Sequence, residues 1–187
     1  MSSIDQAYDK KGREKYILEN ILLENKKLTF EDLLDILFIS ESTLQRDVYS
    51  LKAKLNEYKL DLIKTDKSYL EIVGKEIDKR HFILDYFFSS IYANSFINEL
   101  DELDLFDRST ISQLLIILLD CIREYNISVN DYTIQNLVIH FALVLERVNK
   151  NFLIDKPIKD ISKDRDEYFD DFAGAITNRI SKSFNLE

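Results

Sequence analysis

The sequence predicts a mainly α-helical protein. An N-terminal winged helix-turn-helix, made of three helices and a β-hairpin wing, precedes an all-α domain that forms a helical bundle. Residues 29–74 contain two amphipathic helical segments with a short break between them, and then two short runs of β type. After residue 75, apolar residues recur at helical spacing. We therefore expect a first domain at residues 11–75, a connecting helix and linker at 76–107, and a second domain at 108–187.

The first two helices are indicated by periodicity and by a capping signal. A helix is predicted around four apolar residues at helical spacing: Ile17, Leu18, Ile21 and Leu22. Thr29 is followed three residues later by Asp32, the pattern in which a side chain satisfies the first free N–H groups of a helix. Thr29 is therefore the predicted N-cap of a second helix, whose apolar stripe is Leu33, Leu34 and Leu37.

A third helix follows the break at Phe38-Ile39-Ser40, which has the length of the turn in a helix-turn-helix, and Ser40 is its predicted N-cap. Its predicted buried face consists of Leu44, Val48, Leu51 and Leu55. Six polar or cationic side chains then lie on the other faces: Ser42, Thr43, Gln45, Arg46, Tyr49 and Lys52. Arg can pair with guanine and Gln with adenine in the major groove, while Ser and Thr can contact bases or phosphates.

A polar face opposite an apolar stripe is also what any surface helix presents, so the segment that follows matters. Residues 60–65 and 69–73 are two β-type runs joined by the polar turn Asp66-Lys67-Ser68. They predict a wing that carries Lys64 and Lys67 near its tip. Together, the helix and the wing favour a DNA-binding surface that includes all eight of these residues.

This first part of the chain resembles a known family. Ser40, Ser42, Thr43 and Arg46-Asp47, followed by a wing that closes at Gly74-Lys75-Glu76, are similar to the helix-turn-helix of transcriptional activators with PTS-regulation domains (PRDs). These include the Mga-like and mannitol-operon-activator-like regulators. The resemblance implies a DNA-binding transcription regulator of carbohydrate-utilisation or virulence genes.

Charge is divided unevenly along the chain. Residues 1–80 contain 15 Lys and Arg against 16 Asp and Glu, a balance of −1, whereas residues 81–187 contain 10 against 18, a balance of −8. A protein that binds nucleic acid with its whole surface is excluded, because phosphate affinity comes from clustered cations. We expect a localised DNA contact with modest affinity per monomer, which favours a homodimer.

The second half is predicted to consist of helices at residues 78–91, 110–125, 132–150 and 166–184. Phe82, Ile83, Tyr86 and Phe87 form the stripe of the first. Residues 92–107 are the predicted linker, and residues 151–163, with Pro157, are a predicted loop. The apolar run Leu114–Leu119 is far shorter than the roughly 20 residues that span a bilayer, so it predicts a core helix and no membrane segment.

His140 is the candidate regulatory residue. It lies beside the main apolar face of its helix (Ile134, Val138, Phe141, Leu145, Val148), in line with Asn136 and Arg147. A phosphoryl group on this imidazole would gain charge-assisted bonds from Arg147, although a partly buried structural histidine fits the same pattern. Ile139 and Leu143 make the opposite side apolar too, which indicates either a dimer-facing helix or an enclosed core helix.

Residues 132–148 resemble the opening helix of a PRD, in which a histidine four residues before Ala or Val and six before Glu-Arg is phosphorylated by the phosphotransferase system. The resemblance implies phosphorylation of His140, supported by Arg147 and Asn136, with HPr or an enzyme II component as the donor. Such domains usually carry a second histidine on a later helix, and none follows His140 here. The resemblance therefore implies an N-terminal part of a longer regulator, with its regulatory domain incomplete at the C-terminus.

Other classes of protein are disfavoured. Cys121 is the only cysteine and is expected to be a small buried hydrophobe, which leaves no disulfide and no cysteine-based metal site. The three glycines are isolated and form no phosphate-binding loop, no nucleophile and base stand out, and no signal peptide is visible. We expect a cytoplasmic protein that is not an enzyme and needs no metal or cofactor.

Two alternatives to the main hypothesis remain at this stage. The helical domain could serve only for dimerisation or for sensing a ligand, without phosphorylation. The chain could also be an RNA-binding antiterminator of the related regulatory family. Such antiterminators begin with a small β-rich domain, which the helical segment at residues 11–55 does not resemble.

Overall fold

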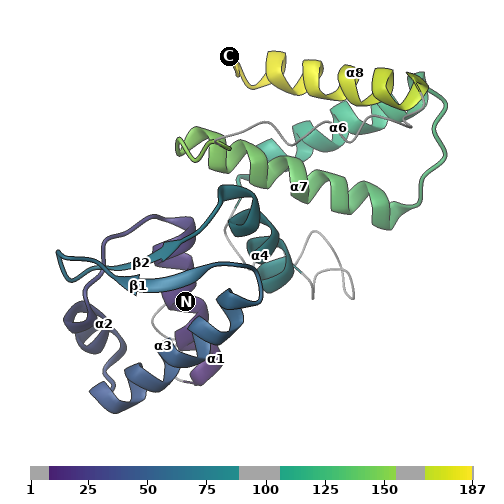
Figure 1. The fold of residues 1–187 in the computed structure, drawn as a ribbon. Helices are drawn as coiled ribbons and strands as arrows, with labels where there is room; N and C mark the ends of the chain where they lie inside the picture. The colour runs from purple at the N-terminus through teal and green to yellow at the C-terminus, as the bar shows by residue number, and fades with distance from the viewer. Residues whose placement is uncertain (1–8, 89–105, 155–166, 187) are drawn as a thin grey trace. The chain divides into compact units, whose positions relative to one another are not determined.

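The computed structural model describes residues 9–88, 106–154 and 167–186, and the chain divides into two compact units between Ile83 and Leu84 (Figure 1). The predicted class is confirmed: most described residues are helical, and a small antiparallel hairpin lies in the first unit. Among the described residues, no helix combines the length and apolar character needed to cross a membrane.

The first unit has the predicted winged helix-turn-helix order. Helix α1 (Lys10–Leu18) continues into the short π-helix η1 (Glu19–Leu23), and α2 (Phe30–Leu37) and α3 (Glu41–Asn56) follow. Strands β1 (Asp61–Lys64) and β2 (Leu70–Val73) then lead to α4 (Glu76–Phe88). The core is formed by leucines and isoleucines that are at most 5% exposed: Ile17, Leu18, Leu22, Leu33, Leu44, Leu51, Leu55, Leu60, Leu62, Leu70, Ile72 and Ile83.

Both predicted helix caps are present. The Thr29 hydroxyl accepts the Asp32 N–H at 3.0 Å, and the Asp32 carboxylate accepts the Thr29 N–H at 2.8 Å, which completes a capping box. Ser40 begins α3 by accepting the Thr43 N–H at 3.3 Å. These caps fix the start of each helix of the motif, and therefore also the length of the turn between them.

The wing is a two-stranded antiparallel hairpin in which Lys64 pairs with Leu70 and Asp61 with Val73. Its turn at residues 66–68 was predicted, and Ser68 adopts the left-handed conformation there (φ 65°). The strands receive a further partner from the segment before α2, because Thr29 forms a bridge with Tyr69 and the Leu28 carbonyl accepts the Leu70 N–H at 2.9 Å. This contact joins the wing to the start of α2.

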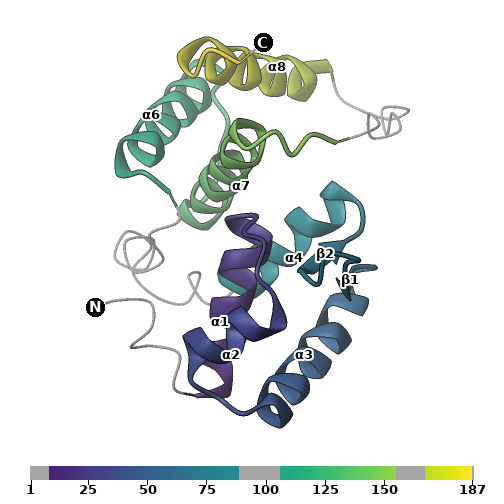
Figure 2. The ribbon, with the colours of Figure 1, turned by 90° about the vertical axis from the view of Figure 1, so that its left-hand side faces the viewer.

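The second unit contains α6 (Arg108–Glu124), α7 (Asp131–Asn149) and α8 (Glu167–Ser183), and α6 packs against both other helices (Figure 2). Asp107 and Asn130 cap α6 and α7. The buried cluster between the three helices consists of Leu114, Ile117, Leu118, Cys121, Val138, Ala142, Leu145, Ile176 and Ile180.

Some predicted details differ from the structure. Val48 is only half-buried, and its neighbour Asp47 is buried instead. The run Leu114–Leu119 contributes Leu114, Ile117 and Leu118 to the core, as predicted, whereas Ile116 in the same run is 60% exposed. Ile139 and Leu143 are both buried, which is one of the two outcomes that the sequence left open. The predicted linker up to residue 105 and the loop at 155–163, with Pro157, lie outside the described residues.

Candidate nucleic-acid interface and regulatory histidine

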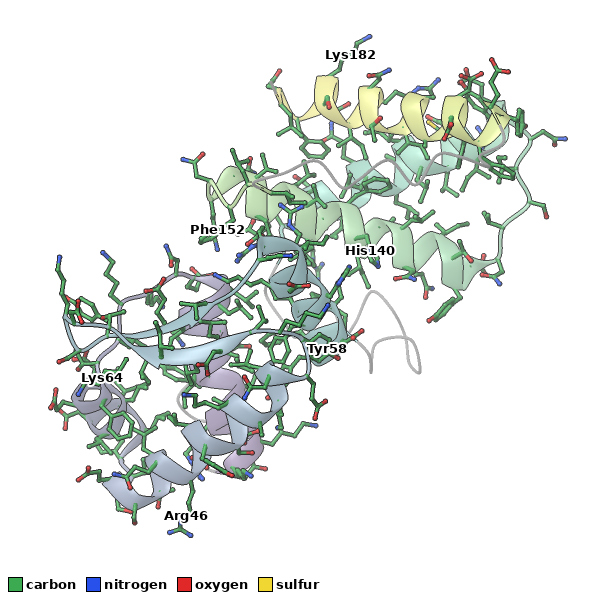
Figure 3. All side chains as sticks on the ribbon, in the orientation of Figure 1. Arg46, Tyr58, Lys64, His140, Phe152 and Lys182 are labelled. Carbon is green, nitrogen blue, oxygen red and sulfur yellow. The ribbon has the colours of Figure 1, made fainter. Side chains whose placement is uncertain are left out.

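The outward face of α3 carries the predicted polar side chains. Ser42, Gln45, Arg46 and Tyr49 are exposed, and Thr43 and Lys52 are half-buried. Arg46 projects away from the rest of the first unit (Figure 3), and its Nε donates to the Ser42 carbonyl at 3.1 Å within the same helix. This bond holds the base of the guanidinium against the helix and leaves its outer edge directed at solvent, the arrangement that a base-reading arginine needs.

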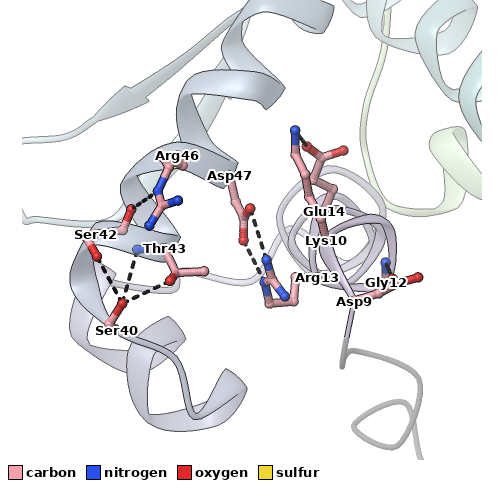
Figure 4. Close-up of polar contacts among 10 residues, drawn as sticks. All are labelled: Asp9, Lys10, Gly12, Arg13, Glu14, Ser40, Ser42, Thr43, Arg46 and Asp47. Atoms are coloured by element: carbon pink, nitrogen blue, oxygen red, sulfur yellow. Dashed lines mark hydrogen bonds and ion pairs between the residues drawn. The ribbon is translucent and has the colours of Figure 1, made fainter.

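Hydroxyl groups gather at the N-terminus of α3. Ser40 Oγ lies 3.1 Å from Ser42 Oγ and 2.9 Å from Thr43 Oγ1, and all three side chains meet at the first turn (Figure 4). The first N–H groups of a helix carry partial positive charge, so this end attracts a phosphate. Because Ser42 and Thr43 both contact Ser40, their hydroxyls are held at the first turn of α3.

Two other predicted contact residues are paired within the protein. Gln45 Nε2 donates to Glu41 Oε1 at 3.0 Å, and Lys52 Nζ lies 3.3 Å from Asp61 Oδ1 at the start of β1. Gln45 keeps its second amide hydrogen and its carbonyl oxygen for an adenine edge. Asp61 partly neutralises the charge of Lys52, so Lys52 should attract a phosphate less strongly than the two wing lysines do.

The wing adds cations beside α2 and α3. Lys64 and Lys67 are both exposed, on β1 and at the turn. Lys27 is also exposed, and it precedes the segment that joins the wing through Leu28 and Thr29. Sequence reasoning missed Lys27; the signal was the pair Lys26-Lys27 directly before the cap at Thr29. The wing and the segment that pairs with it thus carry three exposed lysines, with the exposed Asp66 between two of them.

Two ion pairs between α1 and α3 hold α3 in place. The Arg13 guanidinium binds the Asp47 carboxylate at two points, 2.7 Å and 3.2 Å (Figure 4), and Lys54 Nζ donates to Glu14 Oε2 at 2.5 Å. The Glu14 side chain is 2% exposed. Burial alone raises the pKa of Glu14, but hydrogen bonds from Lys54 and Ser50 and the charges of Lys54 and Lys10 outweigh it and leave the pKa below its usual value.

His140 lies on α7 with an exposed side chain, on the side of the helix away from α8 (Figure 3). Asn136, one helical turn earlier, is half-buried. An exposed imidazole can be reached by a phosphoryl donor, and it lies outside the buried cluster between α6, α7 and α8. The structure therefore places the predicted phosphorylation site on a surface.

Arg147 has a different environment from His140. It is 1% exposed, and its Cζ lies 3.9 Å from the centre of the Phe152 ring. Phe152 also donates its N–H to the Arg147 carbonyl at 2.8 Å, and Asn151 adopts the left-handed conformation (φ 61°), which together form a Schellman motif at the end of α7. Seven residues of helix separate Arg147 from His140, a rise of about 10.5 Å. Arg147 therefore anchors the end of α7 in this structure.

The described residues contain no group of three or more His, Cys, Asp or Glu side chains arranged to hold a metal ion. Cys121 is buried, as predicted, and its burial raises the pKa of the thiol. Its position in the α6–α8 cluster is that of a small apolar core residue.

Two family models match the chain, one in each part of the sequence. Residues 2–87 match the Mga helix-turn-helix domain, and residues 116–187 match the PRD domain. The chain is also similar to the probable licABCH operon regulator of Bacillus subtilis (strain 168), with 27% identity over 153 residues. The match covers 77% of this chain and 23% of that relative, so the chain spans about a quarter of the length of the relative.

Proposed function

Since the chain joins an Mga helix-turn-helix domain to a PRD domain, we propose that it is a sequence-specific DNA-binding transcription regulator controlled by the phosphotransferase system. Its targets are carbohydrate-utilisation or virulence genes, and its site of action is the cytoplasm. The observation that carries the proposal is the exposed polar face of α3, on which Arg46 is directed outward and which begins at a hydroxyl-lined helix start.

In this proposal α3 enters the major groove of double-stranded DNA. Arg46 and Gln45 read base edges, and Tyr49 lines the same face one turn further along. Ser42 and Thr43 contact a phosphate at the helix N-terminus, and Lys64 and Lys67 of the wing, with Lys27, contact the flanking backbone. Lys52 adds a weaker backbone contact from beside Asp61. The modest number of cations favours a homodimer, because two copies double the phosphate contacts.

His140 provides the regulatory input. HPr or an enzyme II component transfers a phosphoryl group to the exposed imidazole, which adds about two negative charges beside a helix whose other sides are buried. Asn136 lies about 6 Å away along the helix, one turn before His140, and is the nearer of the two supporting side chains. Arg147 supports the phosphoryl group only when its guanidinium leaves the Phe152 ring, so phosphorylation competes with the end of α7. Phosphorylation of His140 would in this way change the conformation at the end of α7.

DNA binding is tested by selecting duplexes from a randomised library with the 187-residue chain and then measuring affinities. Arg46→Ala should weaken binding to the selected site by roughly 1 to 3 kcal/mol and relax the preference at one base pair. Lys67→Ala should weaken binding to all sequences and flatten the dependence on salt. Arg123→Ala, which removes an exposed arginine of α6, is the matched control. Equal binding by wild type and Arg46→Ala would contradict the assignment of α3.

Regulation is tested by incubating the chain with phosphoenolpyruvate, enzyme I, HPr and candidate enzyme II components, followed by mass spectrometry under non-acidic conditions. One phosphoryl group is expected on the wild type and on His81→Ala, and none on His140→Ala. His81 is the other histidine of the chain and is also exposed, so it is a matched control. If the wild type takes up no label, also when extended beyond Glu187, the helical domain serves dimerisation or ligand sensing instead.

A further inference from the structure

Phe38, in the turn of the helix-turn-helix, is 86% exposed, more than any other large apolar side chain among the described residues. It follows the last residue of α2 and lies two residues before Ser40, the N-cap of α3. A single exposed apolar side chain is ordinary on a protein surface. The backbone at Phe38, however, makes this one unusual.

Phe38 adopts the left-handed conformation, with φ 52° and ψ 45°. Bulky side chains are rare there, because the Cβ atom crowds the backbone, and Gly or Asn is the usual residue at such a helix end. After four other helices of the described chain the residue is asparagine: Asn25, Asn126, Asn151 and Asn185 take the same conformation after η1, α6, α7 and α8, and after α3 it is Lys59. Only after α2 does an aromatic residue occupy this position, although the turn itself would form more easily with asparagine.

The strain of the left-handed backbone at Phe38 is not offset by packing within the first unit, because the ring is almost fully exposed and buries little apolar surface. Backbone strain at a surface position is typical of residues kept for binding. The surface that continues from Phe38 is the start of α3, with Ser40, Ser42 and Thr43 in contact with one another. Phe38 is therefore the apolar end of the surface assigned above to DNA.

We propose that Phe38 reads DNA directly, by placing its ring against the 5-methyl group of a thymine in the major groove at the N-terminal end of α3. This inference rests on the proposed function. Thymine is the only base whose major-groove edge carries a methyl group, and an apolar side chain such as Phe is a recognised partner for it. The hydrogen bonds that Gln45 and Arg46 make to base edges do not depend on that group, so an apolar contact from Phe38 would add to them.

The test uses the intact chain and the duplex selected by it. Each thymine of the site is replaced in turn by deoxyuridine, which removes only the methyl group and keeps the base pair. Affinities are measured for wild type, Phe38→Asn and Phe38→Leu. Asparagine suits the left-handed backbone, so Phe38→Asn removes the ring without disturbing the turn, and its thermal melting should be no lower than that of wild type. Leu153→Asn, at another exposed apolar residue, is the control for a general loss of apolar surface.

At one thymine, loss of the methyl group should weaken binding by wild type about fourfold, the value of one buried methyl-sized group, and should leave binding by Phe38→Asn unchanged. Phe38→Leu should keep part of the effect, and Leu153→Asn should behave as wild type. If wild type selects and binds a site but no thymine shows this coupling, Phe38 faces something other than a base and the inference fails while the proposed function stands. If wild type selects no sequence at all, the proposed function fails and the inference fails with it.

Discussion

Arg13 of α1 holds Asp47 of α3 in a two-point ion pair, with Nε 2.7 Å from Oδ2 and Nη2 3.2 Å from Oδ1. The two side chains are 12% and 3% exposed. Asp47 directly follows Arg46, the residue assigned to base reading. The ion pair therefore fixes the rotation of α3 about its axis, and with it the direction in which Arg46 points. A planar guanidinium that meets a carboxylate at two points restricts orientation more than a lysine could.

Loss of this pair should loosen α3. Asp47→Asn keeps one acceptor oxygen for the guanidinium of Arg13 but removes the negative charge of this part-buried pair, and the expected cost is roughly 1.5 to 3 kcal/mol, the range for hydrogen bonds to charged groups. Hydrogen exchange measured by mass spectrometry should become faster in peptides of α1 and α3 and stay unchanged in peptides of α6–α8, which serve as the internal control. Arg13→Lys should fall between wild type and Asp47→Asn. Unchanged exchange in α3 would show that apolar packing alone holds the helix.

The second pair between these helices predicts a dependence on pH. The folded-state pKa of Glu14 is lowered, so its contribution to stability is present above the ordinary carboxylate pKa of 4.5 and is lost as pH falls below it. Glu14→Gln should therefore lower stability by roughly 2 kcal/mol at pH 7, the value of hydrogen bonds to a charged group, and by much less in acid. Thermal unfolding followed by circular dichroism at pH 7 and in acid measures the difference.

Glu57→Gln, at an exposed glutamate just after α3, is the control for the general loss of a carboxylate. Its melting temperature should follow that of wild type at both pH values. If the gap between wild type and Glu14→Gln is the same at pH 7 and in acid, the ionised carboxylate of Glu14 is not what stabilises the contact between α1 and α3.

Local signals made most of the fold predictable. The capping box of Thr29 and Asp32, the cap at Ser40 and the turn before Tyr69 each lie within a few residues of sequence, and each occurs in the structure as expected. The pairs of Arg13 with Asp47 and of Glu14 with Lys54 join residues 34 and 40 positions apart. The spacing of apolar residues does not show which charged side chains on two helices form ion pairs. In the sequence, Asp47 therefore looked like any solvent-exposed aspartate.

The candidate site was predictable to a similar degree. Helical spacing was enough to put Arg46 and Tyr49 on an exposed face, because the leucines opposite them had to be buried. It was not enough to foresee that Lys52 pairs with Asp61, or that Arg147 is buried against Phe152. Those contacts depend on where a strand begins and how a helix ends in three dimensions. The left-handed backbone at Phe38 is likewise invisible to composition.

Gly74, between β2 and α4, should not tolerate a side chain. Its φ is 141°, and an added Cβ atom would lie 2.4 Å from Leu60 Cδ2 and 3.2 Å from the Lys59 carbonyl oxygen. Since Leu60 is 1% exposed and has little room to move, Gly74→Ala should destabilise the first unit by roughly 2 to 4 kcal/mol through strain and overpacking.

Gly174 in α8 provides the opposite case. A Cβ atom there meets nothing within 4 Å, so Gly174→Ala should stabilise the second unit by roughly 0.5 to 1 kcal/mol, the difference in helix propensity. Thermal unfolding of the two variants should therefore shift in opposite directions. If Gly74→Ala has the same melting temperature as wild type, the end of the wing can rearrange to accept the added Cβ atom.

Arg147 allows the structural and regulatory roles of one side chain to be separated. Arg147→Met keeps a long apolar stem against Phe152 but removes the charge, whereas Arg147→Ala removes both and should cost a further 2 kcal/mol or so of packing, typical of a large-to-small change in a core. If the guanidinium serves only to end α7, phosphorylation of His140 should change the melting temperature equally in wild type and Arg147→Met. If the guanidinium leaves Phe152 to bind the phosphoryl group, phosphorylation should shift the melting temperature of wild type and the hydrogen exchange of peptides around residue 152. Both shifts should be lost in Arg147→Met, although His140 should be phosphorylated to the same extent. Labelling that fails in Arg147→Met would instead place the guanidinium in recognition of the phosphoryl donor.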